Sequence, residues 1–388
     1  MTRAPNSQGA ITRKVHARPI SRSVSGSTAT VSVVIPCYNY ADYLADAVTS
    51  VLTQVGVSVD VIIIDDHSTD GSHDVAQSLA NSDHRVRVFR NSFNRGPVCT
   101  YNHGLEHVTG EFTVRLDADD MLTPGSLLRS TTLARQYPSV GLVYGHPVHF
   151  IETVSESSVH SKWGRPAIVA PSSTPPYRHK VKRWTIWPGR QWLSDRCRSG
   201  LNVITSPEVL MRTSVVTLVG GQRPLPHTHD MEMWMRIATA ADIAYIEGAD
   251  QAWHREHGRS LSGLVTSPQA ELEHQQLAFD TLFGQLENST ENRSLLESAH
   301  KALAGRAVRE ASHQMDRGRA TPSVIDSLSS YATNVYAGAA RGREWRLLQA
   351  RIALQRHWPV NRSPFALAAA GRRLKHEWAQ ARWERWGT

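Results

Sequence analysis

The feature that most constrains this fold is an alternation of short apolar runs with helical patterns in the first half of the chain. Residues 31–36 form a β-branched run that a proline ends, and residues 59–64 form a second run of the same kind. Between them, Leu44, Val48 and Val51 recur at helical spacing. Strands that alternate with helices in this way are typical of a parallel sheet covered on both faces. The sequence therefore predicts an α/β fold.

Polar side chains follow the predicted strands at the point where each strand ends. They lie at residues 36–39, at residues 65–66 and at residues 117–120, within VRLDADDM. Ligands of such sheets bind in the crevice at the carboxyl ends of the strands, so we expect the three clusters to converge there. Crowded carboxylates need a positive charge or water beside them. A divalent cation is one candidate, and a solvated turn is the other.

The crevice lacks two common phosphate-binding motifs. No G-x-G-x-x-G follows the first strand, and there is no Walker A lysine loop, which disfavours dinucleotide-binding folds and P-loop NTPases. Asp66 could instead accept hydrogen bonds from a base or ribose. Asp119, with Asp117 nearby, could hold Mg²⁺ or Mn²⁺, which favour oxygen ligands. Such a metal would neutralise a departing diphosphate.

Four sequence blocks resemble the nucleotide-binding half of family 2 glycosyltransferases, which have the GT-A fold. In chain order the blocks are VSVVIPCYNYADYLADAVTSVLTQ, VIIIDDHSTDGS, NRGPVCTYNHGL and GEFTVRLDADDMLTP. The resemblance continues through HDMEMWMRIA to HREHGRSLS and covers about residues 31–262. It implies a mostly parallel, Rossmann-like sheet sandwiched by helices and an inverting transfer of sugar from a nucleotide-sugar.

The resemblance also implies roles for single residues on the donor side. Pro36, Tyr38 and Asn39 would line the nucleotide pocket. Asp66 would contact the base, and Asp117 would face the ribose or donor sugar.

On the reaction side, the resemblance makes Asp119 the metal ligand, for Mn²⁺ or Mg²⁺. Asp230 stands where the family places its catalytic base, with His229 replacing the usual Glu. Asp230 could also be only the N-cap of its helix. The expected diphosphate contacts are Arg95, His257 and Arg255.

Two departures from the family pattern stand out. Tyr101 occupies a position that usually holds Arg, and either Arg95 or Arg115 could replace the lost cation. The sequence GGQRPLPHTHD also lacks the Asp that often follows the paired glycines. Asp65 could be structural, helping to cap the next helix.

The outer parts of the chain differ from this central pattern. Residues 1–29 are basic, contain no acid and are rich in Ser, Thr and Pro, which predicts a disordered tail. Residues 30–265 are predicted to form the GT-A domain, with residues 151–200 irregular. Residues 266–388 are predicted to form a helical C-terminal extension. Four tryptophans could stack on acceptor sugars or belong to a core: Trp163, Trp184, Trp187 and Trp192.

Cysteine content and hydropathy favour a cytoplasmic protein. Three cysteines suggest free thiols in a reducing compartment, and no stretch approaches the ~20 apolar residues of a spanning helix. Leu374, Trp378 and Ala381 form an apolar stripe among basic residues. This helix could lie on the inner membrane face, or it could pack on the catalytic domain or a second subunit. The net charge of +8 favours acidic partners, although no nucleic acid is expected.

The sequence therefore predicts an inverting, metal-dependent glycosyltransferase. The donor would be a nucleotide-sugar, with UDP-sugars favoured, and the acceptor a glycan, a lipid-linked molecule or a small molecule. Polysaccharide, cell-envelope or natural-product glycosylation are the expected settings. Two alternatives stay open: a catalytically degenerate nucleotide- or glycan-binding protein and, as a weaker one, a nucleotidyltransferase, whose usual Gly-rich basic loop is missing.

Overall fold

The computed structural model describes most of the chain. It covers residues 11–19, 27–151, 168–169, 175–258, 267–316 and 321–355, and six single residues of a helix between 371 and 382.

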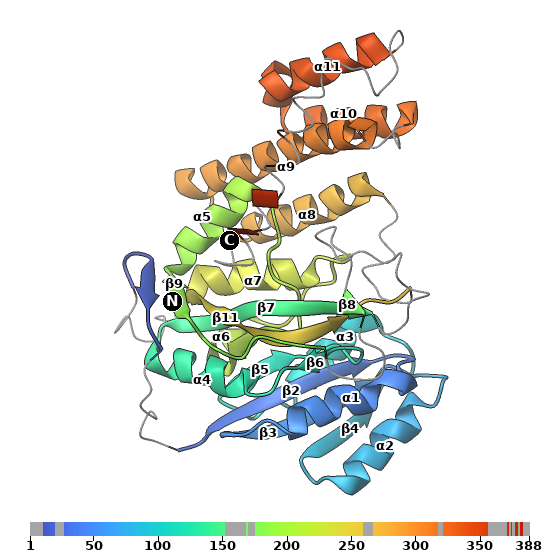
Figure 1. Ribbon diagram of the computed structural model, residues 1–388, viewed down its shortest axis with the longest axis vertical. Coiled ribbons are helices and arrows are strands. Elements are labelled where there is room, and N and C mark those ends of the chain that lie inside the picture. Colours follow the sequence, from blue (N-terminus) through green and yellow to red (C-terminus); the bar gives the residue numbers. More distant parts are fainter. Residues whose placement is uncertain are drawn as a thin grey trace.

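One mixed sheet forms the centre of the molecule (Figure 1). Among the described residues its main path runs β1-β9-β11-β7-β10-β5-β2-β3-β4. The parallel half consists of β2 (Ala29–Cys37), β3 (Val57–Asp65), β4 (Val86–Arg90) and β5 (Phe112–Arg115).

The other half of the sheet is mixed. Antiparallel β10 (Leu210–Arg212) joins β5 to β7 (Val140–Ile151), and β11 (Asp242–Arg255) runs parallel to β7. Antiparallel β9 (Arg183–Trp187) and β1 (Val15–Ala17) follow. Short β6 (Met121–Leu122) pairs with β11, and β8 (Ile168–Val169) pairs with β7.

Helices cover both faces of this sheet. One face carries α1 (Ala41–Leu52), α2 (Ser72–Ser82) and α4 (Ser126–Gln136), and the other carries α3 (Gly96–Leu105), α5 (Gly189–Ser199), α6 (Thr213–Val219) and α7 (His229–Ala240). Successive residues of a strand point to opposite faces of the sheet. Val33 and Ile35 accordingly pack with the helices of the first face, and Val34 packs with those of the other face. The predicted α/β fold with a largely parallel sheet is confirmed.

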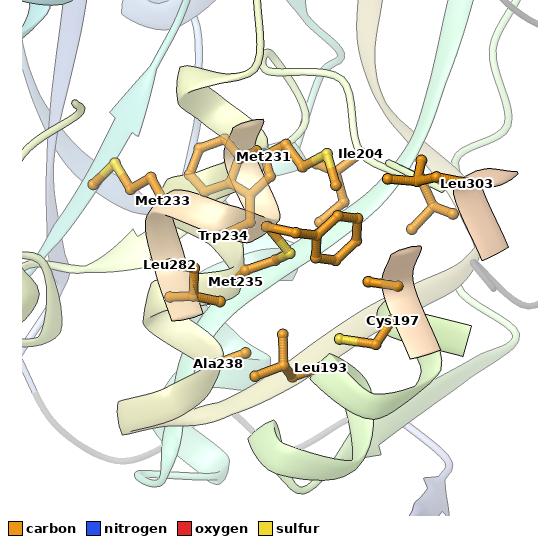
Figure 2. Packing of buried hydrophobic residues seen from close by; sticks show 14 of the residues in the cluster. Leu193, Cys197, Ile204, Met231, Met233, Trp234, Met235, Ala238, Leu282 and Leu303 are labelled. Carbon is orange, nitrogen blue, oxygen red and sulfur yellow. The ribbon is translucent and has the colours of Figure 1, made fainter. Parts of the chain in front are cut away.

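The C-terminal helices stack outward from α7 (Figure 1). They are α8 (Pro268–Phe283), α9 (Thr290–Asp316), α10 (Pro322–Val335), a 3₁₀ helix (Ala337–Arg341) and α11 (Arg343–Gln355). Their apolar side chains share one cluster with α5 and α7, part of which Figure 2 shows around Trp234. This cluster anchors α7, the helix that carries Asp230.

Two expectations about local structure need correction. Residues 183–199, predicted irregular, form β9 and α5. Residues 15–17, predicted as part of a disordered tail, form β1 and pair with β9, because the edge of β9 offers free backbone groups. The other residues of that tail are described only at 11–14, 18–19 and 27–29.

The tryptophans are core residues where the structure describes them. Trp184, Trp187 and Trp192 are each at most 2% exposed, so none of the three is available to stack on a sugar. Trp163 lies outside the described residues.

The predicted C-terminal stripe is exposed. Leu374 is 60% exposed and Trp378 is 71% exposed on one helical face. Within the described part of the chain, no helix is both long and apolar enough to cross a membrane.

Candidate active site

Each aspartate after β5 has its own partner. Asp117 accepts from Arg115 Nε at 3.0 Å. His257 Nε2 lies 2.9 Å from Asp119 Oδ2, and His254 Nδ1 lies 3.0 Å from Asp120 Oδ2. Each of the three crowded carboxylates therefore has a basic side chain beside it. The three partners differ, so the carboxylates lie in three different environments.

Asp120 and His254 form a buried ion pair beneath the crevice. Asp120 is fully buried, and its Oδ1 also accepts from the backbone amide of Arg255 at 2.9 Å. Burial alone would lower the pKa of His254, but the Asp120 carboxylate outweighs it and raises that pKa to about 10. The pair therefore ties the end of β11 to the loop after β5.

The Asp119–His257 pair has the chemistry of a metal-binding pair. The two atoms are hydrogen-bonded at 2.9 Å, and a carboxylate and an imidazole are both possible ligands of a divalent ion. Among the described residues, no group of three or more His, Cys, Asp or Glu is arranged to hold a metal ion.

Two tyrosines of α1 and its N-cap support this pair. The Tyr43 ring stacks on the His257 ring at 5.3 Å, and Tyr40 meets it edge-on at 5.9 Å. Burial raises the pKa of Tyr40, and Asp119 raises it further, so the hydroxyl stays protonated and bonds to Asp119. The aromatic side chains restrict the orientation of His257.

Arg255 is buried beside the backbone of the D-x-D loop. It is 2% exposed; its Nε donates to the Asp119 carbonyl at 2.9 Å, and its guanidinium stacks on Tyr43 at 4.5 Å. These contacts hold the D-x-D loop, and the predicted diphosphate contact of Arg255 stays a prediction. Arg95 is exposed at the N-cap of α3, so its predicted phosphate contact stays a prediction.

Asp66 anchors the start of α3. Its Oδ1 accepts from Asn91 Nδ2 at 2.7 Å and from the Arg95 amide at 2.8 Å, and its Oδ2 accepts from the Gly96 amide at 2.8 Å. A carboxylate has about four acceptor sites, so one on Oδ2 remains for a ligand donor. Asp65 is fully buried and pairs with Arg90 at 3.0 Å, which supports the structural interpretation.

The predicted nucleotide pocket lies at the end of β2. Asn39 has a φ of 59°, and its side chain accepts from the Thr69 amide at 2.8 Å. This bond joins the ends of β2 and β3, while Tyr38 is 43% exposed beside it. Pro36 lies within β2, two residues before Tyr38, and is partly buried. The fold thus brings all three residues to the edge that holds Asp66.

Arg115 links the D-x-D loop to α7. Burial disfavours its charge, but the carboxylates of Asp117 and Asp230 outweigh burial and raise its pKa. His229 is 8% exposed, and burial together with Arg115 lowers its pKa, so it is a neutral neighbour. Arg115 therefore pairs directly with Asp117, and Asp230 acts on the same guanidinium electrostatically.

Sequence reasoning missed the charges that hold α7. Glu232 is fully buried and pairs with Arg236 at 2.9 Å and with Arg223 at 2.7 Å. Arg236 also donates to the carbonyls of Gly220 and Gly221. A Glu four residues before an Arg was the available signal. The network fixes the loop before α7. It therefore also fixes the position of Asp230 in the first turn of that helix.

Part of this chain is similar in sequence to a known protein family and to several curated proteins. Residues 32–190 match the model of glycosyl transferase family 2. A Campylobacter jejuni GalNAc(5)-diNAcBac-PP-undecaprenol β-1,3-glucosyltransferase is 33% identical over 30% of this chain and 37% of its own length. A putative teichuronic acid biosynthesis glycosyltransferase, TuaG of Bacillus subtilis, is 41% identical over 23% and 36%. The matched segments thus span little more than a third of these relatives.

Solved structures extend the likeness to most of the fold. S. aureus TarS residues 1–349 in complex with UDP-GlcNAc superpose with a TM-score of 0.53 at 16% identity, over 84% of this chain and 92% of that one. The mannosyltransferase PcManGT of Pyrobaculum calidifontis, in complex with GDP-Man and Mn²⁺, gives 0.51 at 16% identity over 86% and 83%. Residues 32–190 of this chain thus resemble glycosyl transferase family 2 in sequence, and the fold of the chain resembles those of TarS and PcManGT.

Proposed function

We propose that this protein is an inverting, metal-dependent glycosyltransferase that moves a sugar from a nucleoside diphosphate to an acceptor hydroxyl. One observation carries the proposal. The Asp119–His257 and Asp117–Arg115 pairs follow β5, Asp66 follows β3 in the same sheet, and Arg115 bonds to Gln222 in the loop that leads to Asp230. A metal site, a sugar-facing carboxylate and a base are the groups that such a transfer needs.

The donor base would bind between Tyr38 and Asp66. Uracil and guanine both offer a ring N–H to the remaining acceptor site on Asp66 Oδ2, whereas cytosine does not. Two neighbours were solved with UDP-GlcNAc and GDP-Man, which agrees with a base of this kind. We favour a UDP-sugar, whose pyrimidine could stack on the exposed ring of Tyr38.

The metal would be held by Asp119 and His257. An imidazole ligand favours Mn²⁺ over Mg²⁺, which prefers oxygen alone. A bound ion supplies charge neutralisation for the leaving diphosphate. Tyr40 and Tyr43 keep the two ligands oriented.

Asp230 would act as the general base. It removes the proton of the acceptor hydroxyl as that oxygen bonds to the anomeric carbon and the bond to the diphosphate breaks. The incoming oxygen approaches from the face opposite the leaving group, so configuration inverts. The N-terminus of α7 fixes this carboxylate, because Met231, Met233 and Trp234 are buried behind it (Figure 2).

The acceptor would be a glycan or a lipid-linked molecule, and a small molecule is the alternative. The relatives named for undecaprenol-linked and teichuronic acid substrates support an envelope or polysaccharide setting. The exposed stripe of Leu374 and Trp378 supports peripheral contact with the cytoplasmic membrane face. A degenerate binding protein fits less well, because it needs no base at Asp230.

The test is a panel of UDP-, GDP- and dTDP-sugars measured with Mn²⁺ and with EDTA. We expect one nucleotide family to raise the melting temperature by mass action only when Mn²⁺ is present, with slow release of the nucleoside diphosphate. The His257→Ala variant should lose the Mn²⁺-dependent part of the shift. An equal shift in EDTA would overturn the metal role, and no shift with any donor would favour the degenerate protein.

A further inference from the structure

The side chain of Arg115 has an unusual set of contacts for a residue at the end of a central strand. It is 3% exposed, and its Nη2 lies 2.8 Å from Asp117 Oδ1, which also accepts from Nε at 3.0 Å. Its Nη1 donates to Gln222 Oε1 at 3.0 Å. The guanidinium lies over the ring of Tyr101, 5.5 Å from its centroid. Each edge and one face of the cation are therefore fixed.

Gln222 connects this cation to the loop that precedes α7. Its backbone amide and carbonyl bond to the Asn102 side chain of α3, each at 2.8 Å. A Cβ on the neighbouring Gly221 would lie 2.4 Å from Asn102 Oδ1, so the loop approaches α3 as closely as only glycine allows. Arg115 thus sits where β5, α3 and the loop before α7 meet.

Asp117 pairs directly with Arg115 at 2.8 Å, whereas Asp230 acts on it only electrostatically. The Asp117 side chain is 32% exposed, so this ion pair opens towards the crevice and is not part of a closed core. A buried guanidinium is expensive unless it is paired and hydrogen-bonded. Its partners here are Asp117, which is assigned to the donor side, and Gln222, which lies in the loop before the helix that carries Asp230.

We propose that Arg115 is a positioning residue that fixes Asp117 on the donor side and Asp230 on the acceptor side relative to each other. The inference rests on the proposed transferase function. Because Asp117 Oδ1 receives both bonds from Arg115, Oδ2 is the atom left for a ribose or sugar hydroxyl. One guanidinium therefore joins the carboxylate that would hold the sugar to the loop that leads to the base that would activate the acceptor.

This role also accounts for Tyr101, which stands where the family usually has Arg. Here the cation comes from β5, and the ring on α3 is the platform under it. The two side chains are neighbours, so exchanging them would return the cation to α3 without changing the composition of the site.

The first test is Arg115→Lys, which keeps the charge but loses the planar fork that binds Asp117 and Gln222 together. We expect kcat to fall about tenfold or more and the donor KM to rise several-fold, because small misplacements of reacting groups are costly. Arg212→Lys is the matched control. Arg212 stacks on Phe112 at 5.1 Å and donates to the Val140 carbonyl, at the other end of β5. It should lower the melting temperature similarly and leave kcat and KM unchanged.

A second variant keeps the test decisive if Arg115→Lys does not fold. Gln222→Met removes one acceptor of Arg115, while the Asn102 bonds persist because they use the backbone of residue 222. We expect kcat to fall about three- to tenfold. The exchange variant Tyr101→Arg with Arg115→Tyr should recover part of the kcat that Arg115→Lys loses.

The outcomes separate this inference from the function on which it rests. If the wild type transfers sugar and both Arg115→Lys and Gln222→Met keep kcat and KM within twofold, Arg115 is merely structural and the inference is overturned. If the wild type transfers no sugar from any donor, the proposed function and this inference fall together.

Discussion

Three aspartates in four residues look alike in the sequence but differ in the structure. Asp117 is held by a guanidinium, Asp119 lies beside an imidazole and a tyrosine hydroxyl, and Asp120 is buried against His254. The sequence could predict that such a cluster follows a strand and faces a crevice. It could not predict the partners of Asp119 and Asp120, because they come from β11 and the residues after it, and only the folded sheet brings the two segments together.

A pair of variants can distinguish the proposed catalytic role of Asp230 from a purely structural role at the start of α7. Asp230→Asn should lower kcat about 10²–10⁴-fold, because an amide cannot accept the acceptor proton. It should leave the donor-dependent rise in melting temperature unchanged. Asp74→Asn is the control, since Asp74 is an exposed acid in the first turn of α2. Each change should remove only about 0.3–1 kcal/mol of helix-dipole stabilisation. The N-cap of α7 is Thr228, so equal kcat values in the two variants would make Asp230 only an acid of the first turn.

His254 predicts a pH dependence of stability. Its folded pKa is raised from 6.5 to about 10, so the folded state holds a proton that the unfolded state releases. The stabilisation is fully present below pH 6.5 and is lost as pH rises towards 10. In metal-free buffer, the melting temperature should fall less steeply over this window in His254→Gln than in the wild type. His84→Gln, whose side chain is 95% exposed, is the control and should follow the wild type.

At the scale of elements, regular patterns were predictable and edge pairings were not. The strands and helices of the first 136 residues, apart from β1 and β6, follow from the sequence pattern, because most of them bury apolar side chains at regular spacing. β1 has three residues and exists through its pairing with β9. No local pattern distinguishes such a strand from a tail. β9 does alternate, as RWTIW, but the surrounding prolines and basic residues obscure it.

The charge network of α7 predicts a large effect of one neutral substitution. Glu232→Gln should destabilise the fold by about 3–5 kcal/mol, because it leaves Arg236 and Arg223 without the buried carboxylate that they share. Denaturant unfolding measures this loss. Glu271→Gln is the control, because Glu271 and its partner Arg306 are 46% and 19% exposed. Its cost should be at most about 1 kcal/mol. A small loss for Glu232→Gln would show that water reaches this network.

At the scale of the whole molecule, one apolar cluster runs from the sheet into the C-terminal helices. It includes Val34 of β2, Trp234 of α7, Leu303 of α9 and Leu348 of α11. The sequence predicts helical segments after residue 266, but their polar composition does not show that they share a core with the sheet. The core is shared because α9 packs against both α5 and α8. As a result, α7 lies between the sheet and the C-terminal helices (Figure 1).

A shared core predicts that the described sheet and helices unfold together. Leu303 is fully buried, and Figure 2 shows it near the α5 residue Cys197. Leu303→Ala should destabilise by about 2–5 kcal/mol and shift a single unfolding transition, because the cavity weakens the contact between α9 and α5. Leu354→Ala on α11, where Leu354 is 43% exposed, should change stability by no more than about 0.5 kcal/mol. Two separate transitions in Leu303→Ala, with donor-dependent stabilisation confined to one, would instead mean that the C-terminal helices form an independent unit and that α7 holds Asp230 without them.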